Sequence, residues 1–470
     1  NLYFTHIGVE DGLCQNTVCC ILQDHLGFIW LGTKDGLTRY DGYRFRVFKH
    51  DAADPMSIGN NFIRVLYEDA DGLIWIGTNV GVYIYNPETE NFRKFDVATE
   101  RGDVISREVS SIKCDSSGDL WIGVNWQGVF RYDRRDESLE LYEPVPGDTT
   151  SLSSVHVWDL CFDGDGNLWV GSQNGGLDRY DRETDRFVRH RLKGLSDVNR
   201  IVLDKQNQLR FGTMKDGLFS FNPYMGTCQP LLLDSGHKDL FVRAIFVRNS
   251  REVVVGTENG IYIYDCVTRK TRHVNQELGN PYSLSCKAVY SIYCDKEGAL
   301  WFGTYFGGVN YLPPSSSLIF DKFYPIGHSD RLSGKAVREF VRDENGIIWI
   351  GTEDQGLNRF DPVSGKFTHY NSRNSGLSCD NVHGLCVDGD RLYIGTFFGG
   401  FNIMDLKTNE IVALGSQMLP DDSVFSIFRD HDGRIWVGLT YGLCLFHPED
   451  GAFELVREIP ENLFIYDIYQ

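Results

Sequence analysis

The sequence of 470 residues predicts an all-β protein built from the four-stranded blades of a β-propeller. The first observation is a pattern of about V-x-x-I-x-x-D-x-x-G-x-L-W-I-G-T-x-x-G-L-x-R-Y-D, which occurs ten times. Its central glycine recurs every 41 to 48 residues, and a fixed period in this range is typical of repeat architectures. The glycines are Gly32, Gly77, Gly123, Gly171, Gly212, Gly256, Gly303, Gly351, Gly395 and Gly438.

The second observation is that each repeat holds four short apolar runs separated by turn residues. V-x-x-I-x-x-D predicts a strand that ends in a D-x-x-G turn, as at 69–72. L-W-I-G-T predicts a second strand, and G-L-x-R-Y a third that closes before residues such as Asn86-Pro87. Runs such as Phe45–Phe48 and Phe92–Phe95 predict the fourth. No window has a convincing helical period, and four antiparallel strands in about 45 residues are one propeller blade.

The tryptophan of each motif is expected to fill the space between neighbouring blades, because a lone four-stranded sheet leaves both faces unburied. The glycine two residues later is expected to let backbone or an aromatic ring approach closely. Repeats five, six and nine replace the tryptophan by Arg210, Val254 and Tyr393, so those contacts should differ. The motif tryptophans are Trp30, Trp75, Trp121, Trp169, Trp301, Trp349 and Trp436.

The repeats divide at Pro313-Pro314-Ser315-Ser316-Ser317, the best linker candidate. Seven repeats before it predict a closed seven-bladed propeller over 1–317, and 318–470 would hold the first blades of a second, incomplete propeller. Asn462–Tyr469 resembles the first strand of an eleventh unit, so we expect more chain in the natural protein. A single ten-bladed ring is the alternative. Either Leu2–Ile7 or Leu318–Phe323 could supply the outer strand of blade seven, and the sequence leaves both open.

The composition limits the classes of partner. A formal charge of −19 and a pI of about 5.1 argue against nucleic acid and anionic membrane as direct partners, because phosphates need clustered Lys and Arg. A local basic patch at Arg243, Arg248 and Arg251 could still favour a polyanion. No apolar run approaches 18 residues, so no transmembrane helix is expected within this stretch. The missing initiator Met and signal peptide suggest a processed or excised segment.

Metal and cofactor chemistry is not predicted. The twelve cysteines lack CxxC pairs and zinc spacing, so we expect free, mostly buried thiols, with Cys19 and Cys20 on opposite strand faces. The D-x-D-G strings at 69–72, 163–166 and 430–433 lack the remaining ligands of a calcium loop and fit Asp-Gly turns. D-x-x-G-x-x-W is similar to the Asp boxes of sialidase propellers, but the arginine of R-Y-D recurs as a repeat residue, and no catalytic motif is found.

The repeats resemble those of the two-component regulator propeller family, and the resemblance covers essentially the whole chain. The opening GVEDGLCQNTVCCILQDHLGFIWLGTKDGLTRYDGYRF is especially similar to the usual first repeat. This resemblance implies the periplasmic sensor region of an inner-membrane hybrid two-component protein of gut bacteria, with two propellers. A β-sandwich, a membrane helix, a histidine kinase, receiver domains and a DNA-binding module would follow in the parent. It further implies an oligosaccharide bound near the propeller junction and a homodimer whose packing changes.

Candidate ligand-binding residues follow the W-I-G-T strand, because that loop and the loop entering strand one should share one end of the propeller. Trp126 and Trp158 lie outside the repeat pattern, and sugars present flat C–H faces that aromatic rings match. Alternatively, Trp126 caps the motif glycine and Trp158 is core. Two aromatic pairs either cover the core between blades or form a hydrophobic rim. The candidates are Trp126, Gln127, His156, Trp158, Asn174, Tyr305, Phe306, Phe397 and Phe398.

The leading functional hypothesis is a non-enzymatic, glycan-sensing ectodomain. It depends on the identity of the repeats and on the missing catalytic constellation. The alternatives are a propeller enzyme, such as a polysaccharide lyase or glycosidase, and a protein-binding scaffold. Kinase activity is expected only in the C-terminal part of the parent. The sequence does not name the glycan.

Overall fold

The structure, a computed structural model, describes residues 2–192, 194–195, 197–232, 240–314, 331–414, 419–460 and 463–470. It divides into two compact units, 1–319 and 320–470. The described residues form ten four-stranded antiparallel sheets and a single helical turn, the 3-10 helix η1 (Val9–Asp11). The all-β, blade-like fold class predicted from the sequence is confirmed.

In the first six sheets of the first unit, the strands pair in chain order. The first three sheets contain β2 (Val18–Gln23), β3 (Ile29–Thr33), β4 (Gly36–Tyr40) and β5 (Phe45–Phe48); β6 (Ile63–Glu68), β7 (Ile74–Thr78), β8 (Gly81–Asn86) and β9 (Asn91–Phe95); and β10 (Val109–Cys114), β11 (Leu120–Val124), β12 (Gly128–Asp133) and β13 (Ser138–Tyr142). The next three contain β14 (Val157–Phe162), β15 (Leu168–Ser172), β16 (Gly176–Asp181) and β17 (Arg186–His190); β18 (Arg200–Leu203), β19 (Leu209–Gly212), β20 (Leu218–Asn222) and β21 (Thr227–Leu232); and β22 (Val242–Val247), β23 (Glu252–Thr257), β24 (Gly260–Asp265) and β25 (Thr271–Val274).

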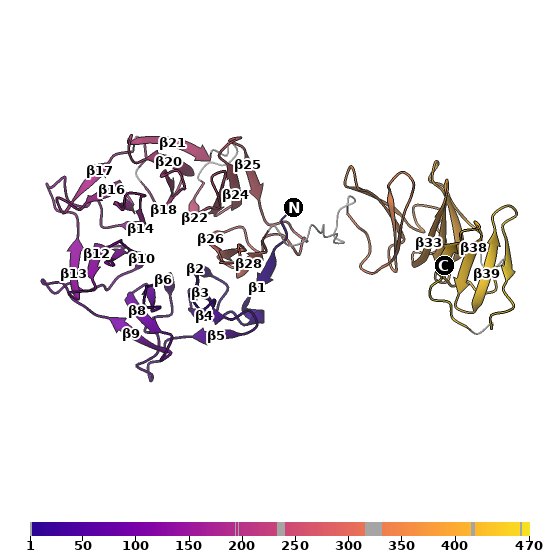
Figure 1. The fold of residues 1–470 in the computed structure, drawn as a ribbon, viewed down its shortest axis with the longest axis horizontal. Coiled ribbons are helices and arrows are strands. Elements are labelled where there is room, and N and C mark those ends of the chain that lie inside the picture. The colour runs from indigo at the N-terminus through magenta and orange to yellow at the C-terminus, as the bar shows by residue number, and fades with distance from the viewer. Residues whose placement is uncertain are drawn as a thin grey trace. The chain divides into compact units, whose positions relative to one another are not determined.

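The seventh sheet closes the ring with strands from both ends of the first unit. Its order is β1 (Thr5–Ile7), β28 (Val309–Leu312), β27 (Leu300–Thr304) and β26 (Val289–Cys294). Thr5 pairs with Tyr311, and β26 lies beside β2 (Figure 1). The prediction that Leu2–Ile7 supplies the outer strand is therefore confirmed, whereas Leu318–Phe323 lies outside the described residues. Because seven sheets already close, a single ten-bladed ring is wrong.

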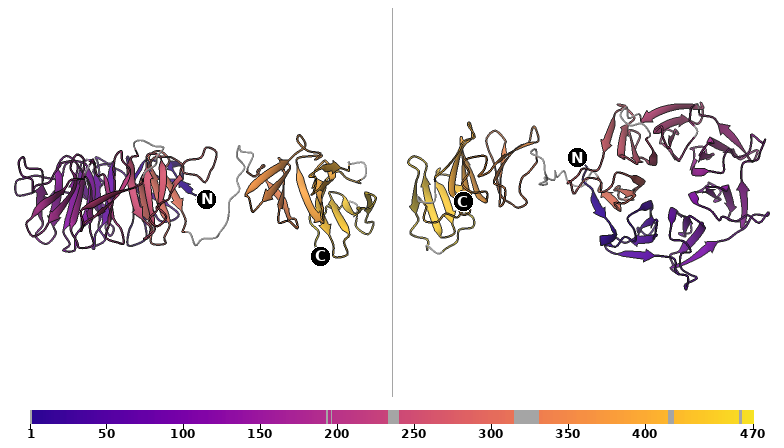
Figure 2. Two further views of the ribbon diagram at one scale, coloured as in Figure 1. Left: turned by 90° about the horizontal axis from the view of Figure 1, so that it is seen from above. Right: turned by 180° about the vertical axis from the view of Figure 1, so that it is seen from behind.

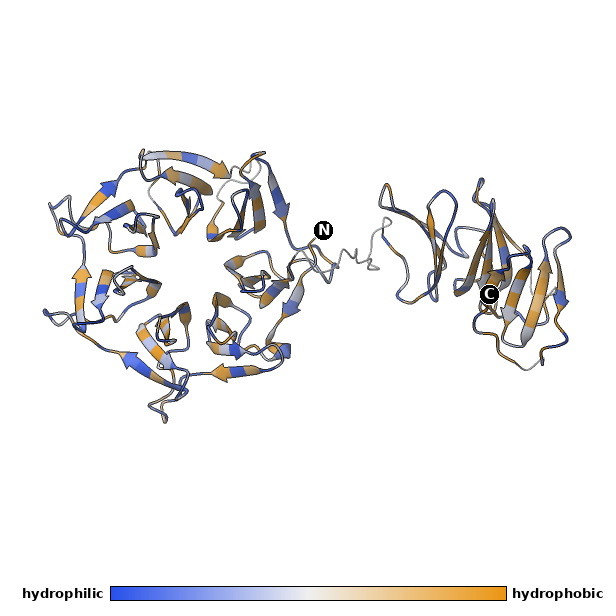
Figure 3. Ribbon diagram, in the orientation of Figure 1, coloured by the Kyte–Doolittle hydropathy of each residue, from blue (hydrophilic) through white to orange (hydrophobic). Residues whose placement is uncertain are grey.

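Hydrophobic and hydrophilic residues both occur along the blades (Figure 3), and edge-on the first unit is a flat disc (Figure 2). Each motif tryptophan of the first unit packs against the next blade, as predicted. Trp30, for example, is 1% exposed and its ring lies 5.0 Å from that of Tyr85. In repeat six, Val254 joins a core with Phe4 and Phe302 instead.

A hydrogen bond that the sequence reasoning missed links the D-x-x-G turn to the tryptophan. The indole Nε1 donates to the carboxylate of the aspartate six residues earlier, while the other carboxylate oxygen accepts backbone N–H groups of the turn, such as those of Asp71 and Leu73. In repeat five, Arg210 replaces the tryptophan and forms a buried ion pair with Asp204 at 2.7 Å. The indole bonds, of 2.7 to 3.1 Å, are Trp30–Asp24, Trp75–Asp69, Trp121–Asp115, Trp169–Asp163, Trp301–Asp295, Trp349–Asp343 and Trp436–Asp430.

The motif glycine admits a close neighbour, and the prediction that backbone approaches it is confirmed at several blades: a Cβ on Gly303 would lie 2.7 Å from the Val18 carbonyl oxygen and one on Gly171 would lie 2.9 Å from that of Val198. No aromatic ring is among the nearest described neighbours; a β-branched side chain at or just before the first strand of the next blade fills the space instead. A Cβ on Gly351 would lie 2.6 Å from Cγ1 of Val382. The blades thus interlock by valine or isoleucine against glycine, in the pairs Gly32–Ile63, Gly77–Val109, Gly123–Val157, Gly171–Val198, Gly212–Val242, Gly256–Val289, Gly303–Val18, Gly351–Val382, Gly395–Val424 and Gly438–Ile465.

The second unit holds three sheets, whose strands also pair in chain order. Their strands are β29 (Val337–Arg342), β30 (Ile348–Thr352), β31 (Leu357–Asp361) and β32 (Lys366–Tyr370); β33 (Val382–Asp388), β34 (Arg391–Thr396), β35 (Gly400–Asp405) and β36 (Ile411–Ala413); and β37 (Val424–Arg429), β38 (Ile435–Leu439), β39 (Gly442–His447) and β40 (Ala452–Leu455).

The C-terminal stretch begins an eleventh blade without forming a strand. The N–H of Gly442 donates to the Leu463 carbonyl at 3.0 Å, as the N–H of Gly400 does to Asp422 at the previous blade boundary. Ile465 packs against Gly438. In the other blades, a residue at or just before the start of the first strand makes the same contact. Residues 463–470 are assigned no strand, so the expected strand over Asn462–Tyr469 is present only as its entry contacts, and Asn462 lies outside the described residues.

All twelve cysteines are free, but only Cys161, Cys386 and Cys444 are fully buried. The prediction of mostly buried thiols was therefore too strong. The other nine are half-buried.

Candidate functional site

One end of the first unit gathers the loops between strands two and three with the loops entering strand one. In six blades of the first unit, the N–H of the residue after the W-I-G-T strand donates to the carbonyl at the entry of strand one, for example from Lys34 to Thr17 at 3.2 Å and from Glu258 to Phe241 at 3.3 Å. The expectation that these two kinds of loop share one end is therefore correct. We call this the loop end of the first unit.

Trp126 is presented outward at the loop end. Its backbone has φ 71°, a left-handed conformation that bulky residues rarely adopt, and the side chain is 66% exposed. The indole meets the His156 ring edge-on at 4.1 Å, and His156 Nδ1 lies 3.2 Å from Asn125 Oδ1. The alternative that Trp126 caps the motif glycine is wrong, because the space beside Gly123 is taken by Val157.

Gln127 and Asn174 differ in how much hydrogen-bonding capacity they leave for a ligand. The Gln127 amide accepts the N–H groups of Ser106 and Arg107 at 3.0 and 3.1 Å and donates to the Val104 carbonyl at 2.9 Å. It therefore holds a neighbouring loop in place, and little of its hydrogen-bonding capacity remains for a ligand. Asn174 is exposed with φ 60°, and its backbone N–H donates to Asp197.

Trp158 lies one residue into β14, where the strand faces the ring axis. It is half-buried and belongs to none of the hydrophobic clusters formed by the described residues. Its indole Nε1 is buried and meets no acceptor in the described part of the chain. Trp158 makes no ring contact with Trp126 there, so the two rings do not form a single platform.

In the aromatic pairs the two members have different roles. Tyr305 packs inward against Tyr290, with ring centroids 5.1 Å apart, whereas Phe306 is 70% exposed. Phe397 packs against Phe425 at 5.4 Å, whereas Phe398 is 69% exposed. The first residue of each pair covers the interior, and the second forms part of an exposed rim. Covering of the core therefore describes Tyr305 and Phe397, and a hydrophobic rim describes Phe306 and Phe398.

The second unit has an aromatic cluster at its corresponding loops. Phe425 lies 4.7 Å from His383, 4.4 Å from Phe464 and 6.0 Å from Tyr466 between ring centroids. Burial, with Arg338 nearby, lowers the pKa of His383, which favours a neutral ring at pH 7. Arg338, which pairs with Glu353, is the cation beside this mainly aromatic cluster.

The sequence reasoning missed a group of cations at the axis of the first unit. Lys34, Arg64, Arg200 and Arg243, which we call the axial basic cluster, come from four different blades. Their positive field acts on the thiol of Cys19, although burial dominates and raises its pKa to about 11. The patch suggested earlier was wrong, because Arg248 and Arg251 pair with Glu252 and Asp265 at the β22–β23 hairpin, apart from this cluster.

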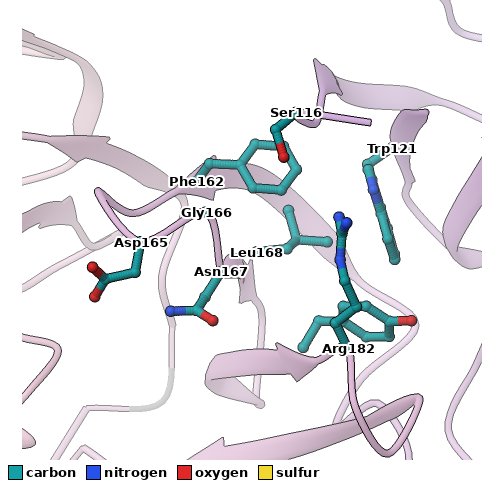
Figure 4. Close-up of a pocket in the computed structure, with 9 residues that line it drawn as sticks. Ser116, Trp121, Phe162, Asp165, Gly166, Asn167, Leu168 and Arg182 are labelled. Carbon is teal, nitrogen blue, oxygen red and sulfur yellow. The ribbon is translucent and has the colours of Figure 1, made fainter. Parts of the chain in front are cut away.

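A polar cavity of about 180 Å³ lies between blades three and four (Figure 4). Trp121 of blade three and Phe162 and Leu168 of blade four line its apolar side, and Arg182, just after β16 of blade four, also lines it. Arg182 donates to Asp115 at 2.6 Å and to Ser117 at 2.9 Å. These bonds join neighbouring blades, so we assign the cavity to blade packing.

Within the described ranges, no group of three His, Cys, Asp or Glu side chains is placed to hold a metal ion. The same residues include no helix with the length and hydrophobicity needed to cross a bilayer.

Comparisons of this chain with known protein families, sequences and structures agree with the geometry of the repeats. Segments 12–35, 57–80, 151–174, 283–306, 331–354 and 418–441 match the two-component regulator propeller family. A 58-residue stretch, 12% of this chain, is 40% identical to histidine kinase P4 of Formosa agariphila, and the match spans 4% of that protein.

Two solved structures share the fold. The extracellular domain of a hybrid two-component system from B. thetaiotaomicron aligns with a TM-score of 0.69 at 23% identity, over 97% of this chain and 73% of that one. A catalytically inactive virginiamycin B lyase from Staphylococcus aureus aligns with a TM-score of 0.51 at 13% identity, over 67% of this chain and 99% of that one. The fold, the regular blade contacts and the matched segments agree: six of the ten repeats of this chain are two-component regulator propeller repeats.

Proposed function

We propose that this chain is the ligand-sensing region of a hybrid two-component sensor, on the periplasmic side of the inner membrane. Its ligand is an oligosaccharide released from a glycan, and binding rearranges a homodimer that is tethered to the membrane by a later segment. Residues 1–317 act as one propeller domain and 318–470 as the start of a second. Histidine kinase activity belongs to the parent protein beyond this chain.

The observation that carries the proposal is the exposed aromatic character of the loop end. Trp126 and Phe306 are each at least two-thirds exposed there, on loops fixed by backbone hydrogen bonds to the entries of strand one. Rings held in this way match the apolar faces of sugars at low entropic cost, and nearby polar groups such as Asn174 match hydroxyl groups. The kinship of the repeats with regulator propellers supports a signalling role.

A propeller enzyme is the second candidate, because the lyase shares the fold. Catalysis needs a base and a charge-stabilising group around one substrate position. At the axis of the first unit, His156 contacts an exposed tryptophan, while Arg64 and Arg243 hold glutamates. This arrangement supports binding more directly than proton transfer, so we propose a non-enzymatic role for this chain.

Binding and turnover can be measured together. Purified chain is titrated with a panel of defined oligosaccharides by calorimetry, and the same mixtures are analysed for shortened or unsaturated products. We expect saturable binding without products. Product formation that one axial substitution abolishes would establish the enzyme instead, and binding of protein partners without any sugar would establish the scaffold.

The aromatic contact is tested by Trp126→Ala, which removes the exposed ring. We expect oligosaccharide affinity to fall about tenfold, because an aromatic anchor in an interface is worth about 1–3 kcal/mol. Tyr43→Ala is the matched control, since Tyr43 is 94% exposed in the outer hairpin between β4 and β5. Equal affinities for both variants would remove Trp126 from the site.

A further inference from the structure

We propose that the loop end of the first unit selects oligosaccharides that carry carboxylate or sulfate groups, and that the axial basic cluster of Lys34, Arg64, Arg200 and Arg243 binds the anion. This inference rests on the proposed function and specifies its ligand class. The net negative charge of the whole chain disfavours an anionic ligand, so the proposal depends on the local arrangement of charges at the axis.

Two cations of the cluster lack a carboxylate partner. Lys34 Nζ donates to the Tyr305 hydroxyl at 3.1 Å, and no carboxylate of the described residues lies within ion-pair distance of it. Arg200 donates only to carbonyls, to that of Arg243 at 2.8 Å and to that of Asn199 at 2.9 Å. A partly desolvated charge without a counter-ion is costly, and a bound anion offsets that cost.

Asp159 is the carboxylate whose charge acts on Arg200, but it is already hydrogen-bonded to other groups. Its carboxylate accepts the Ser111 hydroxyl at 2.9 Å and the backbone N–H groups of Leu160 and Ile201 at 2.9 and 3.0 Å. It reaches Arg200 only through its field, and burial still lowers the pKa of Arg200. The positive charge of Arg200 is therefore not balanced by a direct ion pair.

The other two arginines lie over aromatic rings. The Arg64 guanidinium sits 4.1 Å from the centre of the Phe62 ring and pairs with Glu108 at 3.0 Å. The Arg243 guanidinium sits 3.6 Å from the centre of the Phe241 ring and pairs with Glu258 at 2.5 Å. The ring contact and the ion pair hold each guanidinium in place, and Arg64 also donates Nε to Asn79 at 2.9 Å. Each arginine still keeps N–H donors that these partners do not use.

The local charge count favours an anion. Four cations face Glu108, Glu258 and Asp159, which leaves a formal excess of one positive charge at the axis of a chain whose total is −19. Trp158, whose backbone carbonyl accepts Arg200 at 3.5 Å, adds an indole Nε1 that is buried and lacks an acceptor in the described chain. This local excess of positive charge is what recognition of a carboxylate or sulfate requires.

The test compares matched sugars on the whole chain. β-1,4-Galactotetraose is neutral, trigalacturonic acid carries carboxylates, and neocarratetraose sulfate carries sulfate without carboxylate. Affinities are measured by calorimetry at low and at moderate salt. We expect one of the anionic sugars to bind at least tenfold more tightly than the neutral sugar, and salt to weaken that binding selectively. Which anionic sugar wins distinguishes carboxylate from sulfate.

Two substitutions break the same ion pair with opposite consequences. Arg243→Gln removes a cation and should weaken anion binding about tenfold, whereas Glu258→Gln removes a competing carboxylate and should strengthen it several-fold. A purely structural role of the pair would shift both variants in the same direction. Arg251→Gln, which breaks the distant Arg251–Asp265 pair, is the control and should leave affinity unchanged.

The outcomes separate this inference from the proposed function. Two results overturn the inference: tighter binding of the neutral sugar, or anion binding that both substitutions weaken alike. Either result still supports the proposed function as a sugar sensor. No binding of any sugar in the panel counts against both. A preference for one anionic sugar together with opposite effects of the two substitutions supports both.

Discussion

Asp178 gives a sharp test of the packing argument, because it places a carboxylate where other blades use an amide. It is fully buried in β16, and its Oδ2 accepts the N–H and the hydroxyl of Ser153 at 2.8 and 2.6 Å. Its Oδ1 has no partner among the described residues. The equivalent residues Asn310, Asn358 and Asn402 make the same kind of bond to a serine, but with a neutral group.

The size of the expected stability change follows from the shift in the pKa of Asp178. Burial, opposed by the bonds from Ser153, raises the pKa of Asp178 from 3.8 to about 6. The folded state therefore holds the proton more tightly than the unfolded chain. The resulting stability is fully present below about pH 4 and is lost as the pH rises through 6. A rise of this size corresponds to about 3 kcal/mol, so Asp178→Asn should stabilise the first unit by about 1–3 kcal/mol at pH 7.5.

The assay is denaturant unfolding of the wild type and Asp178→Asn at pH 4.5 and 7.5, with tryptophan fluorescence as the probe. Comparison of two chains at each pH cancels the titration of all other groups. We expect the advantage of the variant to be large at pH 7.5 and to shrink at pH 4.5. Asn310→Asp, the reverse exchange in blade seven, should destabilise with the same pH dependence. If Asp178→Asn is less stable at pH 7.5, or if its advantage does not vary with pH, the reasoning fails.

Three further substitutions test the contacts between and within blades, each read as the free energy of unfolding. Gly351→Ala should cost about 1–3 kcal/mol because its Cβ meets Val382, and Val382→Ala in the same chain should recover part of the loss; simple additivity would refute the contact. Asp69→Asn should cost about 1–3 kcal/mol by removing the acceptor of the Trp75 indole, and an unchanged stability would refute that role. Phe4→Ala should cost about 3–5 kcal/mol, because Phe4 is 2% exposed in the core that closes the ring; a loss below 1 kcal/mol would mean that the ring closes without it.

The candidate site was only partly predictable. Sequence position placed Trp126, His156 and Phe306 at one end of the propeller, because the loops that carry them follow from strand order. Whether each side chain points outward was not predictable. Tyr305 and Phe306 are adjacent in the chain, yet one packs on Tyr290 and the other is exposed, because the neighbouring blade covers only the first.

The sequence by itself determined the blade, since strand alternation, turn residues and the placement of Trp75 or Trp121 between blades are local patterns that repeat at a fixed period. The tertiary structure alone decided what depends on chain segments far apart. Thr5 meets Tyr311 across about 300 residues, and Lys34 and Arg243 converge on one axis from separate blades. Local propensity and periodicity carry no information about such pairings, because they arise only when seven blades have closed a ring.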